Sequence, residues 1–410
     1  MINNKGLYIP IKLLAFFSLF SFLFPVFKIG GFGMKLDLLL LFPLTILILL
    51  IDTHIKKQSL LSKIFIIAFL IFLSMFVSNT LGMNYYGNSK GLSIPTEYSS
   101  FISKILILYV FYFIGQCNII TYKVFLRLIT IIFIVALFFG LFQYLGLPFS
   151  DRLTDLYATT ENQVRKISTG SIRVFSVTGN VLTWAGWSGF IFVFSIFVYK
   201  NQLLKWLMLI LSSSNLLFSS SRGALIAVGA TLLLYMLYKA YRKRDLRFLI
   251  KSLFISSLIV IILVFISLHF FENRVLFFIE RFHFLNEAVF ESGRNIQLQK
   301  VSHVFNTDIL NYLFGIGKPI IDSIGLMEVE PLFLLFAYGI IGISLHYSFI
   351  FIILKKSSKA ISSVFSDVLI FGILYFLIYS FGYFFLREIY SGLLFWSIIG
   401  YFLSQLDYAK

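Results

Sequence analysis

The sequence predicts an all-α, polytopic integral membrane protein with about twelve transmembrane helices, in which residues 1–410 form a single domain. Of the 410 residues, 59% are hydrophobic and only 13% are charged. The mean hydropathy is +0.93, which leaves too little polar surface for a water-soluble protein. In addition, apolar runs of roughly 20 residues, the length that crosses a bilayer, recur from one end of the chain to the other. No long polar block separates them.

The apolar runs give the expected helices in order, and each run ends at a polar or glycine-rich break. The first run lacks a polar, small-residue cleavage site after it, so we expect a retained helix rather than a signal peptide. The twelve runs start near Leu7, Leu36, Ile64, Phe101, Val124, Val181, Leu203, Gly223, Ser252, Pro331, Ser362 and Ile389.

The distribution of lysine predicts the topology. With Lys5 on the cytoplasmic side, every second loop is rich in basic residues, as the positive-inside rule requires. An even number of helices then returns Lys410 to the same side, so both termini are predicted to be cytoplasmic. The formal net charge of +16 is spread over short loops instead of one face, which argues against binding to nucleic acid.

Two long segments fall on the predicted outer side, at residues 147–180 and 272–330. Within the second, residues 274–284 and 294–305 place apolar side chains at helical spacing, which predicts short amphipathic helices. The predicted cytoplasmic loops are too short to fold into a domain. We therefore expect any chemistry to take place on the outer side.

Arginine is distributed differently from lysine. Eight of the twelve arginines lie on the predicted outer side, namely Arg152, Arg165, Arg173, Arg222, Arg274, Arg281, Arg294 and Arg387. For most of them, pairing with nearby acidic residues or with lipid headgroups is a sufficient explanation. Arg222 is different because it separates two apolar runs, where an unpaired guanidinium is costly. A phosphate-bearing ligand matches the bidentate geometry of the guanidinium group.

Local motifs single out Arg173, Arg222 and Arg294. Residues 217–227 have the sequence LFSSSRGALIA, and residues 173–187 have the sequence RVFSVTGNVLTWAGW. Further along are Ser292-Gly293-Arg294 and three later segments, namely residues 314–317 (FGIG), 328–330 (EVE) and 338–342 (YGIIG). In this order, the segments resemble the motifs of the O-antigen ligase and polymerase superfamily.

One position favours the polymerases within that superfamily. Its ligases have a His-Asn pair near the end of the long outer loop, whereas this chain has Glu328 and Glu330 there, which is similar to Wzy-type repeat-unit polymerases of O-antigen or capsule. The resemblance implies a GT-C-like glycosyltransferase in the bacterial cytoplasmic membrane, with its active site on the outer side. The implied substrates are undecaprenyl-diphosphate-linked oligosaccharides. A flippase and a chain-length regulator of the same pathway are further implied partners.

The proposed reaction is metal-independent and needs no cofactor. Arg222 and Arg294 are expected to bind the donor diphosphate, and Arg173 the diphosphate or a closing lid. Glu330 or Glu328 is expected to remove the proton from the acceptor hydroxyl, since a desolvated carboxylate can act as a base near neutral pH. The alternative for these glutamates is a solvated loop end or pairing with Lys318.

Three other functions stay open. A ligase would transfer finished polymer to a lipid or protein acceptor. A lipid-linked oligosaccharide flippase or transporter would require charged or broken helices near the bilayer midplane, where the predicted helices are mostly apolar. A structural subunit would tolerate loss of the outer arginines.

Overall fold

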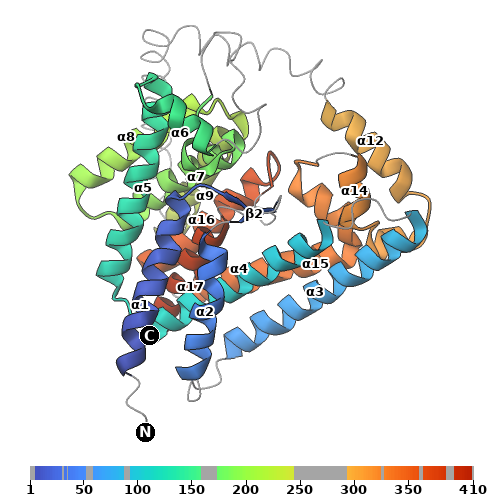
Figure 1. The fold of residues 1–410 in the computed structure, drawn as a ribbon, viewed down its shortest axis with the longest axis horizontal. Helices are drawn as coiled ribbons and strands as arrows, with labels where there is room; N and C mark the ends of the chain where they lie inside the picture. Colours follow the sequence, from blue (N-terminus) through green and yellow to red (C-terminus); the bar gives the residue numbers. More distant parts are fainter. Residues whose placement is uncertain are drawn as a thin grey trace.

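The computed structural model of the protein is an all-helical bundle with one small hairpin (Figure 1). In the described part of the chain, strands are limited to β1 (Phe27–Ile29) and β2 (Phe32–Met34), which pair antiparallel. The structure describes residues 5–29, 32–34, 36–51, 59–86, 93–157, 173–243, 293–324, 327–359, 363–384 and 392–408.

Seven of the described helices are long and apolar enough to cross a membrane. They are α1 (Lys5–Phe20), α3 (Ser59–Tyr86), α4 (Ser93–Gln116), α5 (Tyr122–Leu145), α7 (Val181–Val198), α9 (Arg222–Lys243) and α15 (Glu330–Lys359). Four further apolar helices are shorter, namely α2 (Leu36–Ile51), α8 (Gln202–Phe218), α16 (Val364–Tyr379) and α17 (Gly392–Tyr408). The prediction of an all-α protein with several membrane-spanning helices is confirmed.

The predicted number of twelve spans remains a prediction. Each predicted apolar run in the described residues coincides with one of these helices. The run that starts near Ser252 lies outside the described residues. The four shorter helices fall below the length that crosses a bilayer without distortion.

The predicted outer segments contain short helices. The first holds α6 (Ser150–Tyr157) and the 3₁₀ turn η4 (Ser176–Thr178). The second holds α12 (Gly293–Phe305), α13 (Ile309–Phe314) and α14 (Lys318–Ile324). Helix α12 covers the predicted residues 294–305, whereas residues 274–284 lie outside the described part. Helices α6 and α12 lie in the upper half of Figure 1, and both chain termini lie in the lower half.

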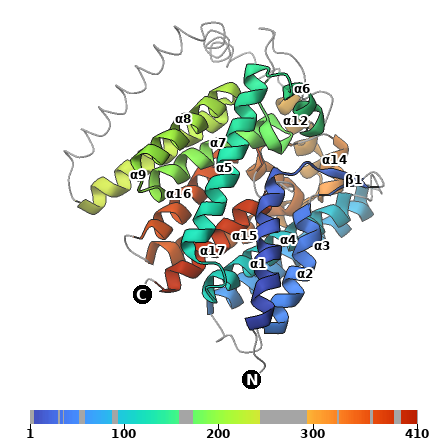
Figure 2. The same ribbon diagram turned by 60° about the vertical axis from the view of Figure 1, so that its left-hand side comes forward.

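Two groups of helices make up the bundle. In one, α7 is the central helix and packs against α8, α9 and α16, with α5 crossing beside them (Figure 2). In the other, α15 packs against α3, and α4 packs tightly against α17. A Cβ atom on Gly400 of α17 would lie 2.2 Å from the carbonyl oxygen of Leu108 in α4. Such small residues allow membrane helices to approach closely.

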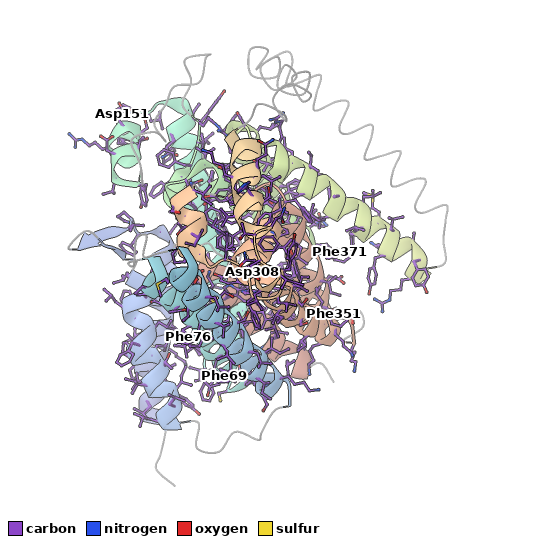
Figure 3. The ribbon with its side chains drawn as sticks, turned by 90° about the vertical axis from the view of Figure 1, so that its right-hand side faces the viewer. Phe69, Phe76, Asp151, Asp308, Phe351 and Phe371 are labelled. Carbon is purple, nitrogen blue, oxygen red and sulfur yellow. The ribbon has the colours of Figure 1, made fainter. Side chains whose placement is uncertain are left out.

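The flanks of the bundle are apolar and exposed. Phe69 and Phe76 of α3 are 65% and 53% exposed, and Phe351 of α15 is 62% exposed (Figure 3). Since exposed phenylalanines on long apolar helices are unfavourable in water, these faces are expected to contact lipid.

Candidate functional site

The sequence Ser219-Ser220-Ser221-Arg222-Gly223 forms the sharp turn between α8 and α9. All three serines are buried, and Ser220 has a φ of 52°, in the left-handed region that few residues other than glycine adopt. Arg222 is the first residue of α9 and is half-buried. The turn therefore places a guanidinium at the amino end of a membrane helix, where unpaired N–H groups and the helix dipole favour an anion.

Arg173 holds this turn in place. Its Nε and Nη2 atoms donate to the carbonyl oxygen of Ser219 at 3.1 and 3.0 Å, and Nη2 lies 3.5 Å from the carbonyl oxygen of Ser220. The last carbonyls of a helix have no partner within the helix, so a cation there satisfies them. Arg173 is thus a positioning residue for the turn that precedes Arg222.

The segment that carries Arg173 is itself anchored to α5. Gln143 accepts hydrogen bonds from the backbone N–H groups of Phe175 (3.3 Å) and Ser176 (2.6 Å). Asn180 then caps α7, since its side chain accepts from the N–H groups of Leu182 and Thr183 at 2.8 and 3.2 Å. The polar stretch with asparagine that precedes the predicted helix therefore builds a rigid entry to α7.

Glu330 lies at the other side of the same region. It is the first residue of α15, is 1% exposed, and its N–H group donates to the carbonyl oxygen of Ser380 at 3.0 Å. Two residues after Ser380, a Cβ atom on Gly382 would lie 3.6 Å from the Cα atom of Gly223. The turn after α16 therefore contacts both the start of α15 and the start of α9.

These contacts bring three predicted residues, Arg173, Arg222 and Glu330, into one region where helix ends meet. We call it the helix-end site, and define it as Arg173, residues 219–223, Glu330 and residues 380–382. The other two predicted residues, Glu328 and Arg294, are located by their positions relative to the helices. Glu328 is half-exposed, two residues before α15. Arg294 belongs to the first turn of α12, which packs against α14 and α15, and its side chain lies outside the description.

The two glycine motifs also meet. Helix α15 is broken at Gly339, where φ is 66° and ψ is −170°. The N–H groups of Ile316 and Gly317 donate to the carbonyl oxygens of Phe336 and Ala337, at 2.8 and 3.1 Å, which the break has removed from the helical pattern. Non-helical backbone at membrane depth requires such internal partners. The close approach also requires glycine, since a Cβ atom on Gly339 would lie 2.3 Å from the backbone of Leu313.

Sequence analysis missed a polar cluster beside this break. The hydroxyl of Tyr338 donates to the carboxylate of Glu97 in α4. Asn79 of α3 donates to Glu97 (3.1 Å) and to the hydroxyl of Tyr98 (3.2 Å), and its side-chain oxygen accepts from the N–H group of Lys318 (3.0 Å). A carboxylate at the edge of an apolar run and an amide within one were the available signals.

Two further observations bear on the predicted chemistry. The ammonium group of Lys318, proposed as an alternative partner of the glutamates, forms an ion pair with Asp322. Across the residues that the structure describes, no group of three or more His, Cys, Asp or Glu side chains is arranged to hold a metal ion.

Comparison with known proteins adds no relative. The chain matches no protein-family model, and no curated protein matches it by sequence.

Proposed function

We propose that this protein is a glycosyltransferase that joins polyprenyl-diphosphate-linked oligosaccharide repeat units into a polysaccharide at the outer face of a bacterial cytoplasmic membrane. The observation that carries the proposal is the helix-end site. Segments of the chain that are distant in sequence place Arg222, its support Arg173 and the buried Glu330 around one set of helix ends. A GT-C-like architecture and an outer location of this site belong to the same proposal.

The donor chemistry requires stabilisation of a leaving diphosphate. In the proposed step, the bond between the anomeric carbon and the diphosphate oxygen breaks, and negative charge develops on that oxygen. Arg222, at the amino end of α9, and Arg294, in the first turn of α12, are proposed to bind it. Preorganised guanidinium groups at a site of low dielectric stabilise this developing charge more than the charge of the ground state.

The positioning function of Arg173 follows from its hydrogen bonds. Because its Nε and Nη2 atoms are bonded to the carbonyl oxygen of Ser219, Arg173 holds the backbone of the turn that leads to Arg222. A direct contact with the diphosphate remains part of the proposal for the rest of its guanidinium group.

The acceptor chemistry requires a base. A hydroxyl of the acceptor sugar attacks the anomeric carbon, and its proton passes to a carboxylate. Glu330 is the stronger candidate because it is buried, whereas Glu328 is half-exposed; burial raises the proton affinity of a carboxylate. The products are the extended glycan on the acceptor lipid and a free polyprenyl diphosphate.

The direct test is incubation of the purified protein with a lipid-linked repeat unit, with and without a chelator. The expected result is a ladder of polymer lengths in both samples. A single transfer of the glycan to a different lipid or to a protein, without a ladder, would instead identify a ligase. Absence of any glycan transfer from a well-folded preparation would contradict the proposal.

A transporter of lipid-linked oligosaccharide is the second candidate function, because two features required of a transporter are present. Helix α15 is broken at Gly339. Lys104 and His346 are buried near the middles of α4 and α15, and are 5% and 8% exposed. Reconstitution in liposomes with a fluorescent lipid-linked oligosaccharide distinguishes the candidates, since a transporter moves the glycan across the bilayer without lengthening it.

A further inference from the structure

Helix α3 packs against α4 and α15 (Figure 1), and all three helices carry buried polar residues that form a line. On α3 and α4 the residues are three or four positions apart and so share one face of each helix, and on α15 they lie on either side of the break at Gly339. We call this line the polar row; it consists of Ser74 and Ser78 of α3, Glu97, Ser100 and Lys104 of α4, and Tyr338, Gly342 and His346 of α15.

Specific contacts join the row across the helices. The hydroxyl of Tyr338 donates to Glu97, and the ring of Tyr338 stacks on the ring of His346 with their centroids 5.6 Å apart and their planes at 9°. The Oγ atom of Ser74 lies 3.1 Å from the position that a Cβ atom on Gly342 would occupy. Long side chains thus connect α15 to α4, while Gly342 allows α15 to approach α3.

Two hydroxyls of the row have no hydrogen-bond partner within the described part of the chain. Ser74 and Ser100 are 6% and 7% exposed, and no hydrogen bond to either Oγ atom is present among the described residues. Other buried serines of these helices, such as Ser78 and Ser103, bond to the carbonyl four residues earlier. An unsatisfied buried hydroxyl costs free energy, and buried water normally satisfies such groups. The row therefore has the chemistry of a hydrated site.

The row also contains groups that can exchange protons. The carbonyl of Gly342 can only accept, so the Nδ1 atom of His346, 2.8 Å away, carries the hydrogen. The Nε2 atom is then the basic nitrogen. The charge of Lys104 acts on this ring, and a second cation is disfavoured beside an ammonium group. A proton on His346 would itself be such a second cation, whereas the carboxylate of Glu97 becomes neutral when it takes up a proton, so Glu97 is the proton-accepting group of the row.

The neighbouring titratable groups that face the interface are few. Tyr98 accepts a hydrogen bond from Asn79, and Lys318 and Asp322 of α14 pair with each other. Tyr98 is therefore linked to Glu97 through Asn79, which donates to both, whereas the side chains of Lys318 and Asp322 are paired outside the row.

We propose that the polar row is a hydrated proton-binding site inside the membrane domain. A proton from water bonds to the carboxylate of Glu97, which accepts a hydrogen bond from the hydroxyl of Tyr338, and the ring of Tyr338 stacks on His346. No covalent bond to carbon changes, and the charge of the row rises by one. Tyr338, which bonds to Glu97, immediately precedes Gly339, so uptake of a proton changes the charge of the group bonded to the residue before the break in α15. This inference stands independently of the glycan reaction.

Water access can be tested with cysteine substitutions in a Cys117→Ser background. Ser74→Cys and Ser100→Cys each place a thiol in the row, and Ile71→Cys and Ile107→Cys, at positions 0% exposed on the same helices, are the dry controls. Only a thiolate reacts with a small methanethiosulfonate, and a thiolate forms only where water reaches it. We expect the row thiols to react at least about tenfold faster than the controls. Equal, slow reaction at all four positions would show that the row is dry, and would overturn the proposal.

Proton binding can be tested by infrared difference spectroscopy of the full-length protein in lipid between about pH 9 and pH 4, the range in which carboxyl and imidazole groups titrate. We expect Glu97→Gln to remove a titrating carboxyl band and His346→Gln to leave that band in place. Glu328→Gln, a half-exposed glutamate outside the row, is the matched control and should remove only its own band. If Glu97→Gln removes no titrating band, the row does not bind a proton. Since neither experiment uses a glycan, failure of the proposed polymerase activity would leave both results interpretable.

Discussion

At the helix-end site the side chain of Arg173 bonds to backbone carbonyls, whereas in the polar row the hydroxyl of Tyr338 bonds to another side chain, that of Glu97. Arg173 satisfies carbonyls at the end of α8, and Glu330 begins a helix whose first N–H group bonds to Ser380. In the row, by contrast, Tyr338 bonds to Glu97 and stacks on His346. The same bundle therefore places polar groups at helix ends in one region and inside helices in the other.

The difference has a physical consequence for function. Backbone groups at helix ends must be satisfied in any fold, so part of the polarity of the helix-end site is structural. A polar side chain inside a membrane helix has no such structural requirement and costs free energy unless it is partnered. Mutations should therefore separate side chains that bind a ligand from those that hold the backbone.

The largest expected effect is that of Arg222→Ala on polymer formation. If Arg222 binds the diphosphate, loss of its guanidinium should lower the rate of glycan transfer at least about 100-fold, as loss of a group that stabilises transition-state charge does in other enzymes. Insertion into the membrane and thermal stability should be unchanged, because Arg222 is half-buried at a helix start. The measurement is the length ladder formed by purified protein from a lipid-linked repeat unit.

Arg242→Ala is the matched control. It removes the same group from the other end of α9, where Arg242 is exposed, and it should leave the ladder intact. A normal ladder from well-expressed Arg222→Ala protein would remove this arginine from the proposed mechanism.

The regions also differ in how far the sequence predicts them. The motif around Arg222 is contiguous, and its hydropathy break predicts a helix start, so its place in the fold was predictable. The hydrogen bonds of Arg173 were not, because its acceptors are backbone carbonyls, which every residue possesses. The row was missed because hydropathy averages over a window, in which one Lys104 or one His346 among apolar neighbours changes the mean only slightly.

The break in α15 was likewise only partly predictable. The sequence marked both glycine motifs, but glycine also occurs inside unbroken membrane helices. The left-handed conformation of Gly339 depends on contact with Leu313 and on hydrogen bonds from residues 316 and 317. Those partners belong to a separate segment of the chain, and no pattern in a single sequence predicts that this segment lies against Gly339.

The second largest expected effect is that of Gly339→Ala on stability. The substitution places a Cβ atom where φ is 66° and where the backbone of Leu313 lies 2.3 Å away. Because that contact is with backbone, relief requires the α13 segment to move, and we expect a loss of about 2 kcal/mol. Thermal unfolding of the purified protein in detergent measures it.

Gly229→Ala tests whether the effect belongs to the break. Gly229 lies in α9, and a Cβ atom added there would meet no other atom within 4 Å. Alanine should therefore be neutral or stabilising by up to about 1 kcal/mol. Equal melting temperatures for the two variants would show that the break does not need glycine.

A smaller effect is expected for Arg294→Lys. Lysine keeps the positive charge but loses the planar fork, so a bidentate contact with diphosphate would weaken and transfer should slow about tenfold. Lys300→Arg, at an exposed position of the same helix, is the reciprocal control and should have no effect. Wild-type transfer by Arg294→Lys protein would mean that Arg294 acts only as a point charge, if it acts at all.

The smallest expected effect is a difference in stability between removing a hydrogen-bonded hydroxyl and removing one that has no partner among the described residues. Tyr338 and Tyr375 are both buried tyrosines of the bundle, at 2% and 0% exposure. The hydroxyl of Tyr338 donates to Glu97, whereas that of Tyr375 has no hydrogen-bond partner among the described residues.

Tyr338→Phe should therefore destabilise the protein by about 1 kcal/mol, the range measured for hydrogen bonds between membrane helices. Tyr375→Phe removes a buried hydroxyl whose desolvation is not offset by a hydrogen bond among the described residues, so stability should be unchanged or higher. The two melting temperatures should move in different directions or by clearly different amounts; a matched loss in both variants would mean that the Tyr338 hydroxyl contributes packing rather than a bond to Glu97.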